Sequence, residues 1–164
     1  MGFKWKLLGF AAIAVIPAAV ARAQAPLVQQ DISMKMALAI IEGAIDRCTK
    51  DGYRVSVVVV GRAGDVVASL RGDGTKPHML EFARLKAYTA DTNPRGQTSL
   101  QFRKSSGERP YLRQIPNIVF IGGGVPIKVG QAVIGAVGVS GAPGEEKDEA
   151  CAFAGIANVA DDLK

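Results

Sequence analysis

The chain has 164 residues, of which 48% are hydrophobic, and a formal net charge of +5. This length supports one hydrophobic core, so we expect a single domain over residues 24–164. Three of the 20 basic residues and none of the 15 acidic ones precede Gln24, which leaves the rest of the chain at +2. No basic stripe with interleaved aromatic residues remains, which excludes a nucleic-acid partner.

Residues 1–23 have the layout of a secretory signal peptide. Lys4 and Lys6 form a basic start, residues 7–20 are mostly apolar, and residues 21–23 form an Ala-x-Ala cleavage pattern. The apolar part is short for a membrane span, and an uncleaved anchor is the alternative. We therefore expect a periplasmic or secreted protein with no stable membrane span after cleavage.

The segment between Ser33 and Gly52 predicts an amphipathic helix. Ser33 is a suitable N-cap and Gly52 a suitable stop. Its apolar residues recur at spacings of three and four, which places them on one buried face. They are Met34, Ala37, Leu38, Ile41, Ala44, Ile45 and Cys48.

Two strands are predicted next. Residues 53–60 are rich in β-branched side chains and lie between two glycines, which favours a strand over a helix. Residues 62–65 form a turn, and residues 66–71 form the antiparallel partner. Residues 72–74 then make a loop.

The middle of the chain predicts two helices and a strand. Residues 78–91 are helical in pattern, and the sequence Asn-Pro-Arg-Gly at 93–96 ends this helix. Thr98 caps a shorter helix that runs through Lys104, and residues 105–116 form an exposed connection. Residues 118–121 are predicted to be a short buried strand.

Eight of the nineteen glycines lie between Gly122 and Gly144. Within this stretch, residues 126–129 and 132–140 predict a hairpin with its turn at 130–131. Glycine weakens a strand, so its recurrence at positions 135, 138 and 141 indicates a close approach to the backbone. A packed helix, another subunit or a flat ligand would each explain it.

A final helix is expected over residues 145–163, with acidic residues near its first turn, where they suit the helix dipole. The element order is thus α-β-β-α-α-β-β-β-α. Hairpins separated by helical blocks predict an α+β fold, a single antiparallel five-stranded sheet flanked by helices.

Cys48 and Cys151 are the two cysteines, and their spacing fits neither a zinc site nor a Cys-x-x-Cys pair. Export would favour a disulfide between them. If the first and last helices lie antiparallel on one face of the sheet, the two cysteines face each other. Two separate buried thiols are the alternative.

The loop at 71–74 and the helix after it carry the candidate binding residues: Arg71, Asp73, His78, Lys86 and Thr89. The loop and the helix start offer backbone donors to an anion, and Arg71 or Lys86 could pair with a carboxylate. His78 could ligate a metal. The alternatives are a local Arg71 to Asp73 ion pair, a solvated Lys86 and a surface His78.

Six pieces of the chain resemble the GlcG/HbpS-like haem-binding protein family, in order and over the whole mature chain. The resemblance implies a sheet flanked by helices, a homo-oligomer, and binding of haem or, less commonly, a corrinoid. Members are also similar to the C-terminal domain of some cobalamin adenosyltransferases. The pieces are VVVGRAG (58–64), LRGDG (70–74), KAYTA (86–90), GGGVPI (122–127), IGAVGVSG (134–141) and DEACA (148–152).

The resemblance implies that the KAYTA helix walls the pocket, just after His78. With haem, His78 would be the axial ligand while Arg71 or Lys86 met a propionate. One position departs from the family pattern, which commonly has Asp where this chain has Gly61. The first hairpin therefore lacks that carboxylate.

The sequence thus predicts an exported protein that binds haem or a related tetrapyrrole without catalysis. No nucleophile–base pair supports catalysis. The alternatives are an auxiliary protein or enzyme acting on a small carboxylate of a glycolate-type pathway, and a purely structural oligomer.

Overall fold

The computed structural model describes residues 1, 26–107 and 109–164. Apart from Met1, the predicted signal peptide and its cleavage site lie outside the described residues. Within the described residues, no helix is long and apolar enough to cross a membrane.

One antiparallel sheet has the strand order β2-β1-β4-β3. The expected α+β fold is confirmed, but the prediction of a fifth strand at residues 118–121 was wrong. Residues 118–121 are half-buried, and the Val119 N–H donates to the Thr89 Oγ1 (2.9 Å) instead of to a strand carbonyl. The strands are β1 (Ser56–Gly61), β2 (Val66–Arg71), β3 (Gly124–Val129) and β4 (Ala132–Ser140).

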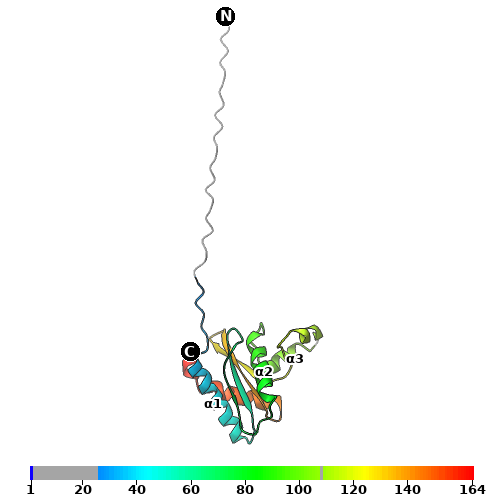
Figure 1. Cartoon of the computed structure of the whole chain (residues 1–164). Helices are drawn as coiled ribbons and strands as arrows, with labels where there is room; N and C mark the ends of the chain where they lie inside the picture. Colours follow the sequence, from blue (N-terminus) through cyan, green and yellow to red (C-terminus); the bar gives the residue numbers. More distant parts are fainter. Residues whose placement is uncertain (2–25, 108) are drawn as a thin grey trace.

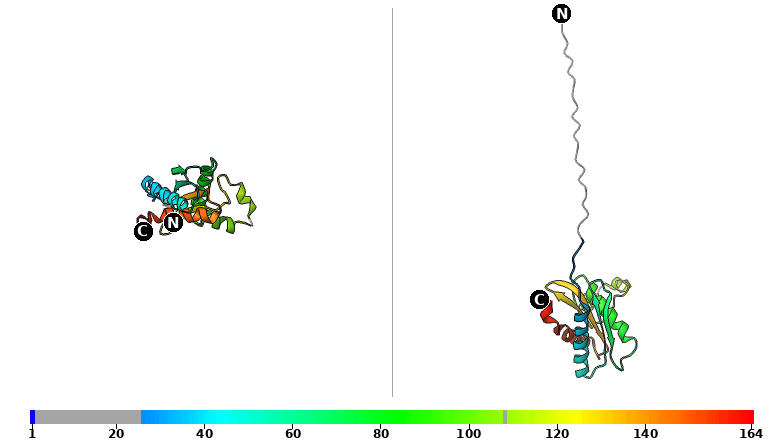
Figure 2. Two further views of the ribbon diagram at one scale, coloured as in Figure 1. Left: turned by 90° about the horizontal axis from the view of Figure 1, so that it is seen from below. Right: turned by 60° about the vertical axis from the view of Figure 1, so that its left-hand side comes forward.

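Helices α1 (Met34–Lys50) and α4 (Glu145–Ala157) pack together against one face of the sheet, as Figure 1 and Figure 2 show. Helix α1 begins where the Ser33 Oγ accepts the Met36 N–H (3.2 Å), as expected for an N-cap. The Cys48–Cys151 disulfide joins the two helices across a Cα–Cα distance of 5.5 Å. The predicted cysteine pairing is therefore confirmed.

Helix α2 (Met79–Thr92) covers the opposite face. It is followed by α3 (Ser99–Ser105) and a 3-10 turn, η1 (Pro110–Gln114), which project to one side in Figure 1. Thr98 and Gln101 form a capping box at the start of α3. A second 3-10 turn, η2 (Ala160–Leu163), ends the chain, so the last helix is shorter than expected.

Strand β1 is buried on both faces. Val57 and Val59 belong to the core under α1 and α4, whereas Val58 and Val60 pack against α2. A strand covered on both sides needs no polar alternation, which explains its continuous run of valines.

The close approach indicated by the glycines is that of a packed helix. A Cβ added at Gly124 would meet the carbonyl oxygen of Lys86, and one at Gly138 would meet that of Ala83. Both carbonyls belong to α2, so this helix lies directly on the backbones of β3 and β4. At Gly135 and Gly141 the nearest atoms are also backbone, from the β1 strand and the segment before it.

The first hairpin regains a carboxylate from the chain that precedes α1. The Asp31 Oδ1 accepts the N–H groups of Ile32 (2.7 Å) and Arg62 (3.0 Å). A Cβ added at Gly61 would lie 2.8 Å from this oxygen. Gly61 therefore makes room for Asp31, which caps the turn between β1 and β2.

Replacing Gly138 by Ala should destabilise the fold by about 2 to 3 kcal/mol, because the new methyl group has no space beneath α2. Urea unfolding of Gly138→Ala measures this change. Gly107→Ala is the matched control, since the nearest atom there lies 3.9 Å away. An equal effect in both variants would contradict the close packing of α2.

Candidate functional site

A pocket of about 280 Å³ lies where α2 begins, β4 ends and α4 begins; we call it the α2 pocket. Its wall is mainly apolar, from Met79, Phe82, Ile121 and Ala142. An adjoining space of about 480 Å³, the loop hollow, shares Met79 and Gly141 with it. The loop hollow is also lined by Tyr53, Arg54, Gly74, Thr75 and Lys76.

A buried ion pair forms the inner wall of the α2 pocket. The Lys86 Nζ donates to the Asp148 Oδ2 (2.7 Å) and to the Val139 carbonyl oxygen (3.1 Å). The Asp148 Oδ1 accepts the Ala142 N–H (2.9 Å). The side chains of Lys86 and Asp148 are only 3% and 5% exposed. Lys86 is thus not a solvated lysine, and its ammonium already has a carboxylate partner.

Burial raises the pKa of the Asp148 carboxyl above its ordinary value, and the charge of Lys86 opposes the rise. The hydrogen bonds from Lys86 and from the backbone also oppose the rise. Burial is the largest effect, so the pKa of Asp148 stays above its ordinary value. The stability of this buried pair requires both partners, because either charge alone would be buried without compensation.

His78 immediately precedes α2 and is exposed. Its ring packs edge-to-face against Phe82, with 5.7 Å between the ring centroids. Because Phe82 lines the α2 pocket, the imidazole stands next to the pocket wall.

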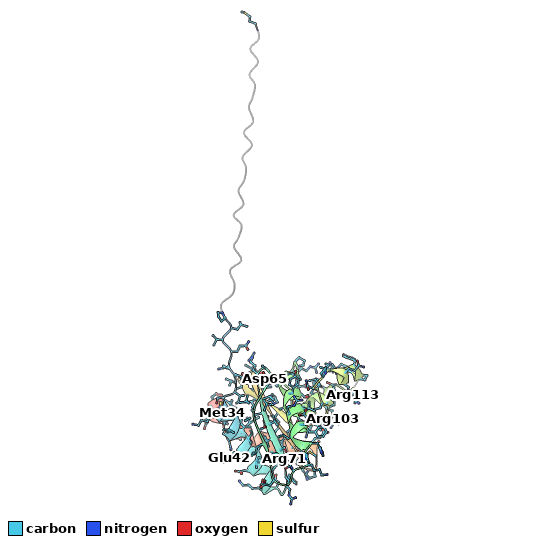
Figure 3. All side chains as sticks on the ribbon, in the orientation of Figure 1. Met34, Glu42, Asp65, Arg71, Arg103 and Arg113 are labelled. Atoms are coloured by element: carbon cyan, nitrogen blue, oxygen red, sulfur yellow. A yellow bond between two sulfur atoms is a disulfide. The ribbon has the colours of Figure 1, made fainter. Side chains whose placement is uncertain are left out.

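Arg71 shapes the loop beside the loop hollow. Its Nε and Nη2 donate to the Thr75 carbonyl oxygen (3.1 and 2.9 Å), which closes the loop that carries Asp73. Asp73 is exposed. Arg71 donates to Thr75 and forms no ion pair with Asp73. In Figure 3, Arg71 lies at the end of β2 opposite to Asp65.

Thr89 lies inside the fold, away from the α2 pocket lining. Its hydroxyl donates to the Leu85 carbonyl oxygen (2.8 Å) and accepts the Val119 N–H (2.9 Å). Thr89 thus attaches the segment before β3 to α2.

The structure places one of the five sequence-predicted residues, Lys86, in the lining of the α2 pocket. Met79, Phe82 and Asp148 were missed. Phe82 could have been found, since it lies one helical turn before Lys86. Asp148 carried no such signal, because it is 62 residues from Lys86. Among the described residues, no group of three or more His, Cys, Asp or Glu side chains could hold a metal ion.

A family profile and a curated relative match most of the chain. A family profile described as "Haem degrading protein HbpS-like" matches residues 32–157. Protein GlcG of Escherichia coli K12 is 32% identical over 109 residues, which cover 66% of this chain and 81% of GlcG.

Solved structures are similar over most of the chain. A double mutant of HbpS from Streptomyces reticuli is 35% identical, with a TM-score of 0.76, and the match covers 86% of this chain and 97% of that one. A haem complex of PduOC has the same fold at 23% identity and a TM-score of 0.67, covering 78% and 94%.

Removing one partner of the buried pair should be costly. Asp148→Asn leaves the Lys86 ammonium without a counter-charge and should lower the free energy of unfolding by about 3 kcal/mol. Adding Lys86→Met should recover most of this loss, because no unpaired charge then remains. Thermal and urea unfolding measure both variants.

Glu81→Gln is the matched control, since Glu81 forms an exposed pair with Arg84 on the same helix. It should cost less than about 1 kcal/mol. If Asp148→Asn is as mild as Glu81→Gln, the pair does not stabilise the pocket wall.

Proposed function

This chain belongs to the HbpS-like family, and from that premise we propose that it binds haem or a closely related tetrapyrrole against the α2 pocket. The observation that supports this most is the apolar wall of Met79, Phe82 and Ile121 beside the only histidine of the chain. The description of the family names haem as what its members degrade. PduOC, which has the same fold, forms a haem complex.

The residues present fit such a ligand. A flat macrocycle packs well against aromatic and thioether side chains, which Phe82 and Met79 supply. His78 offers an imidazole, the side chain that holds haem iron on the proximal side in globins and peroxidases. Arg54 and Lys76 of the loop hollow offer charged donors to the ligand's carboxylates. When bound, haem would supply an iron atom that can change its oxidation state.

We propose further that the protein acts as a homo-oligomer. The α2 pocket and the loop hollow are both open to solvent at the surface of one chain, and at about 280 Å³ the α2 pocket is small for a macrocycle. A second subunit over this surface would complete the enclosure.

Binding without turnover is our first proposal, because Lys86, Asp148 and Ser140 of the α2 pocket already have partners in its wall. The Ser140 Oγ donates to the Met79 Sδ (3.3 Å), and the Lys86 ammonium is paired with Asp148. The family description favours haem degradation as the second candidate. A corrinoid is a weaker third choice of ligand.

A hemin titration tests the proposal. The mature protein should give a saturable change in the Soret band at micromolar concentration, and His78→Ala should shift that band because it removes the imidazole. Lys104→Ala is the control, an exposed cation on α3. Absence of a saturable change would reject tetrapyrrole binding, and an unchanged band in His78→Ala would reject His78 as the ligand. Progressive loss of the bound Soret band in the presence of reductant and dioxygen would support degradation.

Export is part of the proposal and has its own test. When the full chain is produced in a bacterium, the periplasmic or secreted fraction should contain a protein that begins at Gln24. Its mass under non-reducing conditions should match an oxidised Cys48–Cys151 pair. Retention of residues 1–23 in a membrane fraction would indicate an anchor instead.

A further inference from the structure

A polar space of about 390 Å³ lies at the other end of α2 from the α2 pocket; we call it the basic hollow. The helix has 14 residues, so the two ends are roughly 20 Å apart. Three chain segments meet here: the turn between β1 and β2, the loop after α2, and the β3–β4 hairpin. Their polar lining residues are Arg62, Asp91, Asn93, Arg95, Lys128 and Gln131.

Two of the three cations lie against the hairpin and the loop after α2. The Arg62 Nη1 donates to the Val133 carbonyl oxygen (3.2 Å), which fixes the guanidinium beside the hairpin. The Lys128 ammonium lies over Gly96, because a Cβ added at Gly96 would be 3.1 Å from the Lys128 Nζ. A side chain at position 96 would occupy the space that this ammonium uses.

The loop that carries Arg95 is held by Asn93, which is 5% exposed. The Asn93 Oδ1 accepts the N–H groups of Arg95 (3.3 Å) and Gln97 (3.0 Å). Its Nδ2 donates to the carbonyl oxygens of Thr89, Ala90 and Gln97. Arg95 therefore extends from a fixed loop and not from a loose end.

The basic hollow has a surplus of positive charge. None of Arg62, Arg95 and Lys128 forms an ion pair within the described part of the chain. Among the described lining residues Asp91 is the one acid, and Asp31 beside Arg62 is engaged by two backbone N–H groups. The C-terminal dipole of α2 adds only about half a negative charge. Arg62 and Arg95 are exposed and Lys128 is half-buried, so water and salt reduce their mutual repulsion, and an anion in the basic hollow would be attracted by all three.

We propose that the basic hollow binds a tetrahedral oxyanion, of the class of sulfate, phosphate or a phosphate monoester. The two guanidinium groups can each donate two parallel hydrogen bonds to such an ion, and Lys128 adds a compact charge. The space exceeds that of a bare oxyanion and leaves room for a small substituent. This site is separate from the α2 pocket and does not depend on tetrapyrrole binding.

Asp91 makes the binding depend on pH. Burial, with a smaller contribution from the charge of Asp31, raises the pKa of the Asp91 carboxyl to about 6 against the opposing charge of Arg62. The charged groups that face it are Asp31, Arg62, Arg95 and Lys128. An oxyanion favours the protonated Asp91, so its affinity should increase as the pH falls through about 6.

An NMR titration of the mature protein with sodium sulfate at constant ionic strength tests the proposal, because sulfate keeps its charge over this pH range. The amide shifts should saturate and concentrate in residues 93–97 and 128–133 and at Arg62. Lys128→Gln and Arg95→Gln should each weaken binding about tenfold. Asp91→Asn should remove the increase in affinity at low pH.

Lys50→Gln is the matched control, since it removes the same charge from the exposed end of α1, and it should leave the affinity unchanged. Unsaturable shifts spread over the surface, or an equal loss in Lys50→Gln, would overturn the proposal. Inorganic phosphate and glycerol 2-phosphate are the other two probes. Tighter binding of the ester indicates a phosphate monoester site, and equal binding a site for the free oxyanion. Lys128→Gln should still bind hemin, which separates this test from that of the α2 pocket.

Discussion

The contact between the backbone of α2 and the backbones of β3 and β4 is the constraint on which the rest of the structure depends. Side chains normally separate a helix from a sheet, but here Gly124 and Gly138 leave no such layer. The buried face of the helix carries small residues, Ala83, Ala87 and Ala90, which permit this close contact. Because the helix lies so low, Lys86 is carried into the interior and needs a buried carboxylate as its partner.

That partner comes from the opposite side of the sheet. Asp148 lies in the first turn of α4, and the disulfide at Cys151, less than one turn later, ties α4 to α1. The α2 pocket is therefore formed by two layers that meet around the end of β4. At the far end of α2, the same helix meets both hairpin turns and forms the basic hollow. One close-packed helix thus positions two chemically different spaces, one apolar and one polar.

Most of the helices and strands could be predicted from the sequence because their signals are local. Ser33 and Thr98 cap helices where expected, and the valine run of β1 indicates burial on both faces. The cysteine pairing could be proposed because helix periodicity places Cys48 on a buried face. The apolar segment at 118–121 was wrongly predicted as a strand, because its backbone is attached to α2 by the hydrogen bond from Val119 to Thr89 and does not pair with a strand. The Lys86–Asp148 pair, the use of Asp31 beside Gly61 and the basic hollow all join distant segments, which no local pattern reveals.

We propose that the apolar wall at the start of α2 receives a tetrapyrrole. The most direct measurement is the difference electron density of crystals of the mature protein grown with hemin. We expect planar density against Met79 and Phe82, with the His78 imidazole directed at the iron. Planar density at another surface, with the α2 pocket empty, would contradict it.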